Sequence, residues 1–251
     1  MRTDPIASVF RGKRALVVGG SGGIGAALSE DLARRGSSLL IHGRDRIKVE
    51  SLSLSLAGRF GAETGFLAAD IASPSAFAKL LEPYGHFDIV AVSFGPFLRK
   101  SLADTDPEDW ERMALLDLAL PGALAGLYFE GMLEREFGRF LFLGGTRTDA
   151  IRAYRTTAAY SAAKTGLGVL AKSLAAEGSG KNVAALVACP GFVDTEYLGE
   201  ASRREAASRA PGGHLLDPAA LARSILDLLD TEPCAASGAV INLDAGFSPS
   251  V

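Results

Sequence analysis

Residues 15–25 read Ala-Leu-Val-Val-Gly-Gly-Ser-Gly-Gly-Ile-Gly, an apolar run followed directly by a turn rich in glycine. Beyond the turn, Ile24, Leu28 and Leu32 recur at helical spacing, and the pattern ends at Gly36. Glycines permit a tight strand-to-helix turn and let a phosphate approach the helix N-terminus, where N–H groups lack partners. The stretch therefore predicts a strand, a dinucleotide-binding turn and a helix.

The glycine turn fits two phosphate-binding registers. One is Gly20-x-Gly22-x-x-Gly25 and the other is Gly19-x-x-x-Gly23-x-Gly25, and spacing alone does not choose between them. A turn whose glycines serve packing only is the alternative. We interpret the turn as a dinucleotide site, with the candidate cofactor-binding residues Gly19, Ser21, Gly23, Ile24 and Gly25.

The rest of the chain alternates short apolar runs with longer segments of helical periodicity. The runs typical of buried strands are residues 14–19, 38–42, 64–68, 88–93, 139–143, 182–188 and 238–243. Helix starts with an N-cap residue and a proline are Ser73-Pro74, Asp106-Pro107 and Asp217-Pro218. Strands joined through helices form parallel sheets, so we expect an α/β fold with a doubly wound parallel sheet of about seven strands, helices on both faces, and ligands beyond the carboxyl ends of the strands.

Length, charge and cysteine content exclude several other classes. The chain has 251 residues, 48% of them hydrophobic, which suits a single domain over 1–251 with a large core. Its 26 Lys and Arg against 29 Asp and Glu give a net charge of −3, which offers no basic field to a nucleic acid. The sequence shows no secretory signal and no membrane-spanning apolar run, and 2 cysteines are too few for a disulfide framework. We therefore expect a cytoplasmic protein that binds neither nucleic acid nor membrane.

The end of the second predicted strand carries the residue that distinguishes between cofactors. At this place an acidic residue binds the ribose 2′-hydroxyl of NAD, whereas an arginine binds the 2′-phosphate of NADP. The chain reads His42-Gly43-Arg44 here, and Asp45 lies past the strand tip. Arg44 therefore predicts NADP(H) rather than NAD(H). An ordinary surface arginine is the alternative.

A tyrosine and a lysine four residues apart open a later predicted helix. Tyr160 and Lys164 share one helix face, and small residues around them let a ligand approach the backbone. A nearby ammonium group, with a cationic nicotinamide close by, stabilises the phenolate, and the phenol then exchanges a proton with a carbonyl or an alcohol near neutral pH. Both residues are therefore candidate catalytic residues. A half-buried tyrosine beside a surface lysine is the alternative.

Taken together, these features resemble the short-chain dehydrogenase/reductase family over residues 14–246, and most of all its 3-oxoacyl-acyl-carrier-protein reductases. The shared motifs are the register Gly19, Gly23, Gly25, then Ala69-Asp70-Ile71, Tyr160-x-x-x-Lys164, Pro190-Gly191-Phe192-Val193-x-Thr195 and residues 237–246. The resemblance implies a Rossmann-like fold and cofactor contacts from Asp70, Ile71, Tyr160, Lys164, Pro190, Gly191, Val193 and Thr195. Because related enoyl reductases space the tyrosine and lysine more widely, the spacing favours reduction of C=O over C=C.

Two motifs depart from the family pattern in the region that faces the cofactor. Residues 92–95 read Val-Ser-Phe-Gly where Asn-Asn-Ala-Gly is usual, and the resemblance still places Ser93 and Gly95 at the cofactor. The usual catalytic asparagine falls at Asp117, whose carboxylate is expected to hold the water of a proton relay and to pair with Lys164. A helix-interior acid without a catalytic part is the alternative.

The catalytic serine of the family, which binds the substrate oxygen, has no direct equivalent. Aligned from the preceding strand, Gly145 takes its place, whereas counting back from Tyr160 indicates a loop longer by a residue or two. We expect Thr146 to supply the hydroxyl, with Thr148 as the second choice. That neither reaches the substrate is the alternative.

The sequence thus predicts an NADP(H)-dependent enzyme, without a metal ion, that interconverts a ketone or 3-oxoacyl group of a small molecule or acyl thioester and a secondary alcohol. Tyr160 is the expected acid and base, and Lys164 lowers its pKa and binds the ribose. The rival hypothesis is a non-catalytic nucleotide-binding regulator or structural subunit of the same fold. Residues 194–215 are expected to form a substrate lid. The resemblance further implies a homo-oligomer, a tetramer or dimer, formed through helices in 110–134 and 160–177.

Overall fold

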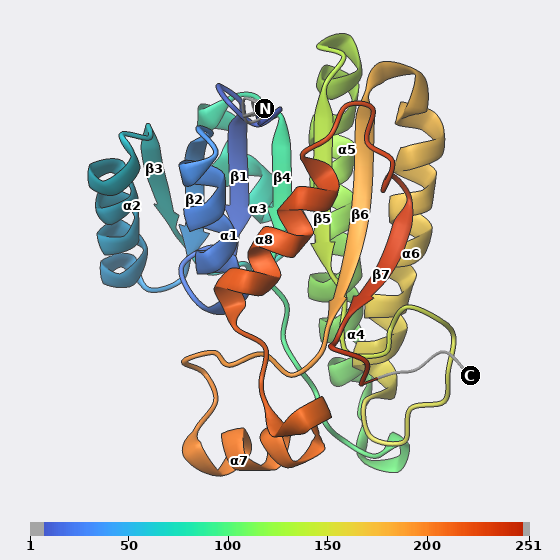
Figure 1. Cartoon of the computed structure of the whole chain (residues 1–251). Coiled ribbons are helices and arrows are strands. Elements are labelled where there is room, and N and C mark those ends of the chain that lie inside the picture. Colours follow the sequence, from blue (N-terminus) through green and yellow to red (C-terminus); the bar gives the residue numbers. More distant parts are fainter. Residues whose placement is uncertain (1–7, 248–251) are drawn as a thin grey trace, which may run out of the picture.

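Parallel strands form one seven-stranded sheet, in the order β3-β2-β1-β4-β5-β6-β7, in the computed structural model, which describes residues 8–247 (Figure 1). The strands are β1 (Arg14–Val18), β2 (Ser38–Gly43), β3 (Thr64–Ala68), β4 (Ile89–Val92), β5 (Gly138–Leu143), β6 (Val183–Pro190) and β7 (Ala239–Leu243). The helices are α1 (Gly23–Arg34), α2 (Arg46–Phe60), α3 (Pro74–Leu81), α4 (Pro107–Ala114), α5 (Leu120–Glu134), α6 (Ala158–Gly178), α7 (Glu200–Arg209) and α8 (Pro218–Leu229). The predicted doubly wound, Rossmann-like sheet is confirmed.

Local sequence signals explain where these elements begin. Each predicted strand agrees with the observed one to within two residues at either end, because continuous apolar runs mark strands covered on both faces. Ser73, Asp106 and Asp217 each accept a hydrogen bond from a backbone N–H group in the first turn of α3, α4 and α8. The proline after each cap has a ring-fixed φ that suits the first helical position.

Helices cover both faces of the sheet and enclose two separate cores (Figure 1). On one face α1, α2 and α8 pack their apolar side chains against the strands, and on the other α3, α5 and α6 do so. Leu28 and Leu32 of α1 are fully buried, as are Leu120 and Leu124 of α5. Burial of each such side chain contributes about 1.5–3 kcal/mol. Both faces therefore hold the sheet, and with it the loops at its carboxyl edge, in a fixed position.

A buried histidine ties the glycine turn to the sheet. The ring of His42 in β2 is fully buried; its Nδ1 accepts the N–H of Gly19 at 3.2 Å, and its Nε2 lies 3.0 Å from the carbonyl oxygen of Ala69. These partners require a neutral ring with its proton on Nε2. Burial lowers the pKa of His42, and the Ala69 carbonyl and the Asp70 carboxylate oppose this shift only in part.

We expect the free energy of unfolding to fall as the pH drops below about 6.5, the usual pKa of histidine. Because the folded chain keeps His42 neutral, the unfolded chain then binds the extra proton, at up to about 1.4 kcal/mol per pH unit. Urea unfolding between pH 7.5 and 5.5 measures this slope. His42→Gln should reduce it, whereas the same change at the exposed His86 should not. Equal slopes in the unmodified protein and in His42→Gln would assign the effect to other groups.

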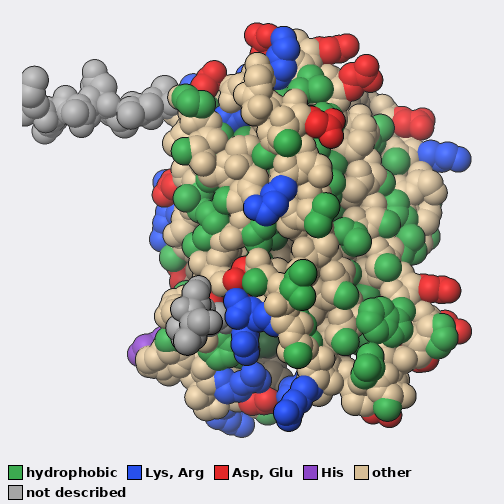
Figure 2. Space-filling model, turned by 90° about the vertical axis from the view of Figure 1, so that its right-hand side faces the viewer, with side chains coloured by type: hydrophobic (Ala, Val, Ile, Leu, Met, Phe, Trp, Pro, Cys, Tyr) green, Lys and Arg blue, Asp and Glu red, His purple; other side chains and the backbone are tan. Residues whose placement is uncertain are grey.

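One apolar helical run stands out among residues 8–247. Pro107–Glu134 is long and apolar enough to cross a membrane, but the core helix of a folded domain meets the same criteria. Leu124 of this run is fully buried against the sheet. Leu115 and Leu127 of this run are 38% and 45% exposed, and Val169 of α6 is 71% exposed. Figure 2 shows hydrophobic side chains in small groups over the side of the molecule where α6 lies. The run therefore serves as a core helix and also presents apolar side chains on its outer face.

Candidate active site

The loops that follow β1, β4, β5 and β6 meet at the carboxyl edge of the sheet. The strand order reverses between β1 and β4, and a parallel sheet opens a ligand crevice at such a point. Candidate residues from the sequence lie in these loops: residues 19–25 after β1, Ser93 and Gly95 after β4, Thr146 after β5 and Thr195 after β6. The fold therefore brings segments that are far apart in the chain to one edge.

Backbone contacts and torsion angles explain several glycines of the turn after β1. A Cβ atom at Gly25 would lie 2.1 Å from the carbonyl oxygen of Gly19, and one at Gly19 would lie 2.8 Å from that of Ser93. Gly19 and Gly23 have φ angles of 75° and 52°, which other residues rarely adopt. These constraints coincide with the register Gly19-x-x-x-Gly23-x-Gly25. The bare backbone and the N–H groups at the start of α1 fit a pyrophosphate.

The side chains at the tips of β2 and β3 are differently engaged. Arg44 is exposed at the tip of β2, while Asp45 caps α2 by accepting a hydrogen bond from the backbone N–H of Lys48 at 3.0 Å. Asp70 is exposed after β3 and accepts a hydrogen bond from the N–H of Ile71 at 3.1 Å. The guanidinium group of Arg44 is therefore accessible at the tip of β2, whereas the neighbouring carboxylate of Asp45 is bonded to the N-terminus of α2.

Lys164 is buried in α6 and forms an ion pair with Asp117. Its Nζ lies 2.9 Å from Oδ1 of Asp117 and donates a hydrogen bond to the carbonyl oxygen of Leu143 at 3.0 Å. The two side chains are 6% and 0% exposed. Within the described residues, no well-directed hydrogen bond reaches either oxygen of Asp117, so the charge of Nζ is its main compensation. Gly95 packs directly on the pair, since a Cβ there would lie 2.0 Å from Oδ1.

A π-helical turn, η3 (Leu115–Ala119), carries Asp117 into this position. It joins α4 to α5, and the N–H of Leu120 bonds to the carbonyl oxygen of Leu115 five residues back. Such turns are rare and are frequently found at functional sites. The sequence indicated a helix interior at Asp117 but carried no signal for the wider turn.

Tyr160 lies one helical turn before Lys164. The ring of Phe97 packs edge-on against the phenol at a centroid distance of 5.0 Å, and Nζ of Lys164 lies 5.9 Å from the phenol centroid. Burial raises the pKa of Tyr160, and the negative charge of Asp117 and the thiol of Cys189 raise it further. The lowering of this pKa by Lys164 and a cationic nicotinamide stays a prediction, because burial dominates the shift in the chain without cofactor.

Gly145 faces the hydroxyl of Tyr160 from the loop after β5. A Cβ atom there would lie 2.8 Å from the phenol oxygen. The hydroxyl of Thr146 donates to the carbonyl oxygen of Pro190 at 3.0 Å, and that of Thr148 is buried and bonds to the backbone of Gly145. Both threonine hydroxyls are thus engaged by backbone groups. The position that faces Tyr160 belongs to Gly145, as alignment from the strand indicates.

Side chains that the sequence did not single out lie over the glycine turn. Glu196 and Tyr197, expected only as part of a lid, contact Gly22 and Gly23 together with Lys48 of α2. Lys48 follows the candidate cofactor-binding residue Arg44 by four residues, and this short separation was the sequence signal that could have placed Lys48 near the site. Lys48 lies at the turn beside Glu196 and Tyr197, which follow it by about 150 residues. No local sequence pattern predicts this contact.

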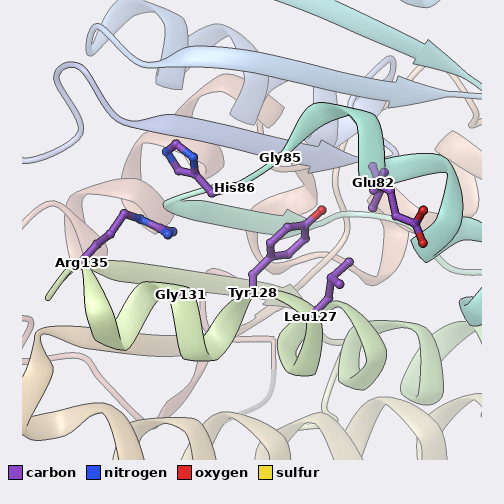
Figure 3. Close-up of a pocket in the computed structure, with 8 residues that line it drawn as sticks. Glu82, Gly85, His86, Leu127, Tyr128, Gly131 and Arg135 are labelled. Atoms are coloured by element: carbon purple, nitrogen blue, oxygen red, sulfur yellow. The ribbon is translucent and has the colours of Figure 1, made fainter.

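A pocket of about 320 Å³ lies at the opposite edge of the sheet (Figure 3). Gly85 and His86 line it just before β4, and Arg135 lines it just before β5. Figure 3 shows Tyr128 of α5 directed toward the segment at Gly85. The pocket holds none of the candidate catalytic or cofactor-binding residues, so we assign the functional site to the carboxyl edge.

Known proteins resemble the chain over nearly its whole length. The 3-oxoacyl-(acyl-carrier-protein) reductase FabG of Escherichia coli is 27% identical over 248 residues, covering 95% of this chain and 98% of the relative. D-beta-hydroxybutyrate dehydrogenase of Cupriavidus necator is 24% identical over 258 residues, covering 95% and 99%. The structure of L-sorbose reductase from Gluconobacter frateurii complexed with NADPH and L-sorbose shares the fold, with a TM-score of 0.86 at 22% identity and coverage of 98% and 100%.

The fold and the site define a nucleotide-dependent oxidoreductase. The family profile described as enoyl-(acyl carrier protein) reductase matches residues 19–248. The chain belongs to the short-chain dehydrogenase/reductase family, whose members use NAD(P) and act on alcohol or carbonyl groups.

Proposed function

We propose that the protein is an NADP(H)-dependent reductase that interconverts a ketone or 3-oxoacyl group and a secondary alcohol. One observation carries the proposal: the glycine turn, the loop after β4 and the catalytic pair of α6 form a continuous surface. The backbone of Ser93 contacts Gly19, and Gly95 packs against Nζ of Lys164. A dinucleotide bound at the turn would extend along this edge toward Tyr160, which suits hydride transfer to a substrate held there.

The residues have distinct roles in this proposal. The bound cofactor supplies the hydride. Tyr160 donates the proton to the carbonyl oxygen, and Lys164 binds the cofactor ribose while Asp117 holds its ammonium group in place. Thr146 orients the carbonyl after its hydroxyl exchanges the carbonyl oxygen of Pro190 for the substrate.

Further residues complete the proposed cofactor and substrate sites. The cofactor contacts are Gly19, Ser21, Gly23, Ile24, Gly25, Arg44, Asp70, Ile71, Ser93, Gly95, Pro190, Gly191, Val193 and Thr195. The acyl-carrier-protein reductase relative supports a 3-oxoacyl substrate. Figure 1 shows α7 projecting beyond the sheet, which supports a lid over 194–215. We also propose a homo-oligomer, because α5 and α6 expose apolar side chains. The proposed location is the cytoplasm.

Oxidation of NADPH, followed by its absorbance across ketones and 3-oxoacyl thioesters, tests the function and the cofactor preference. We expect turnover with kcat/KM at least about tenfold higher for NADPH than for NADH, since a charge-assisted contact contributes about 1.5–3 kcal/mol. Arg44→Ala should remove most of this preference. Arg46→Ala is the matched control, because that side chain is 74% exposed and makes weak contacts, an ion pair of 3.8 Å with Glu50 and a cation–π contact with Phe66. Higher kcat/KM with NADH in the unmodified protein would contradict the NADP(H) assignment.

The same assay separates catalysis from binding alone. The position facing Tyr160 offers no side-chain hydroxyl, because Gly145 occupies it, and this observation favours a non-catalytic nucleotide-binding protein as the second candidate. Binding of NADPH without turnover on any member of the panel would support that candidate over a reductase.

A further inference from the structure

A latch of three side chains, Lys48, Glu196 and Tyr197, covers the glycine turn. The carboxylate of Glu196 accepts the N–H of Gly23 with both oxygens, at 3.0 and 3.2 Å. Nζ of Lys48 lies 2.5 Å from Oε1 of Glu196 and 3.5 Å from the hydroxyl oxygen of Tyr197. These contacts join α2 and the segment after β6 across the start of α1.

The carboxylate of Glu196 occupies a place that suits an anion. Helix α1 begins at Gly23 and has no acidic residue in its own first turn. Its N-terminus carries a partial positive charge and N–H groups without helical partners, and Lys48 adds a full charge. Partial burial raises the pKa of Glu196, but the hydrogen bonds from Lys48 and Gly23 outweigh burial and hold this pKa below its usual value. The carboxylate is therefore ionised at neutral pH.

Tyr197 fills the space that the glycines leave open. Its hydroxyl lies 1.9 Å from the position that a Cβ atom on Gly22 would take, and its ring lies 3.3 Å from the corresponding position on Gly23. Bare backbone at such a turn allows close approach of a pyrophosphate. The latch lies on this same surface, so the latch and a pyrophosphate exclude each other.

We propose that Glu196 competes with the dinucleotide: its carboxylate holds the Gly23 N–H and the Lys48 ammonium group until the phosphate groups of the cofactor replace it. The inference rests on the proposed function, because it takes the glycine turn as the cofactor site. It adds Lys48 as a phosphate-binding residue and couples movement of residues 195–197 to cofactor entry. The Lys48 and Glu196 side chains are 38% and 48% exposed, and exposed pairs are weak enough for a ligand to displace.

The two partners of this ion pair should have opposite effects on the Kd of NADPH, measured by nicotinamide fluorescence. Glu196→Gln removes the competing charge and should lower the Kd about three- to tenfold. Lys48→Met removes the charge that the phosphates take over and should raise the Kd about three- to tenfold. An ion pair with a purely structural role would shift both values in the same direction, and that result would overturn the proposal.

Glu200→Gln is the matched control for loss of a carboxylate. This side chain lies in the same segment, is 89% exposed, and forms a long ion pair of 3.9 Å with Arg204. We expect its Kd for NADPH to equal that of the unmodified protein. A gain in affinity equal to that of Glu196→Gln would assign the effect to net charge and would overturn the latch.

Hydrogen exchange gives a second readout, which does not depend on activity. Without nucleotide, the amide of Gly23 should exchange more slowly in the unmodified protein than in Glu196→Gln, and NADPH should slow it in both. NADPH binding with equal Kd in the unmodified protein and Glu196→Gln would overturn the latch and leave the proposed function intact. Failure of both proteins to bind NADPH would overturn the proposed function and the latch with it.

Discussion

Tyr160→Phe lowers kcat for carbonyl reduction by about 10²- to 10⁴-fold, the range that general acid catalysis contributes. In the proposed function the phenol donates a proton to the substrate oxygen, and phenylalanine keeps the ring but not the proton. The edge-on contact with Phe97 is retained, so the fold and the Kd of NADPH should change little. Steady-state kinetics with the best substrate of the panel, together with NADPH titration, measures both quantities.

Tyr128→Phe is the matched control for this variant. It removes a buried hydroxyl that has no partner among the described residues and that lies at the opposite edge of the sheet. We expect kcat within about twofold of the unmodified protein, because the group is remote from the site. Full activity in Tyr160→Phe would contradict the assignment of the proton donor, and equal losses in the two variants would point to a general effect on the fold.

The raised pKa of Tyr160 decides which form of the phenol the chain holds before cofactor and substrate bind. Because burial keeps the phenol protonated at neutral pH, the chain is prepared to donate a proton to a carbonyl, whereas alcohol oxidation requires the phenolate. Reduction therefore needs no prior ionisation of the protein. Burial is the main cause of this raised pKa, and the carboxylate of Asp117, which pairs with Lys164, adds to it.

Much of the fold could be predicted because its signals are local. Apolar runs, N-cap and proline pairs and the glycine turn each act within a few residues, and each is found where expected. Arg139 in β5 shows where local signals end. Its side chain is fully buried and donates hydrogen bonds to the backbone oxygens of Asn182, Leu229 and Thr231, which lie in distant segments. The partners that make such burial tolerable are set by the tertiary fold.

The candidate site likewise combines features that follow from local sequence patterns with features that the tertiary fold determines. The shared face of Tyr160 and Lys164 follows from helical spacing, and the resemblance located Asp117 beside them. The expected role of Thr146 in binding the substrate oxygen stays a prediction, and no local sequence pattern indicated that its hydroxyl bonds to the carbonyl oxygen of Pro190. The cover of the glycine turn by Glu196 likewise depends on how a distant segment returns to α1.

Lys164→Met should lower the free energy of unfolding by about 3–5 kcal/mol, because it leaves the fully buried carboxylate of Asp117 without its compensating charge. For a chain of this size that loss corresponds to a Tm lower by roughly 6–20 °C. Burial raises the pKa of Asp117 even with Lys164 and Arg112 opposing it, so the folded state binds a proton more readily than the unfolded state does. The variant should therefore be least stable at neutral pH and should recover stability as the pH falls toward 5.

The double variant Asp117→Asn, Lys164→Met separates the structural part of this pair from the catalytic part. Removing both charges leaves neither partner of this pair as an uncompensated ion, so we expect most of the lost stability to return. Turnover should stay low, because the proposed contact of Lys164 with the cofactor ribose is lost. Urea unfolding of the two single variants and the double variant, at pH 7.5 and 5.5, gives the coupling energy directly. A double variant no more stable than Lys164→Met alone would contradict a compensated buried pair. Recovery of stability without recovery of turnover would show that the pair both supports the fold at η3 and holds the ammonium group where the chemistry requires it.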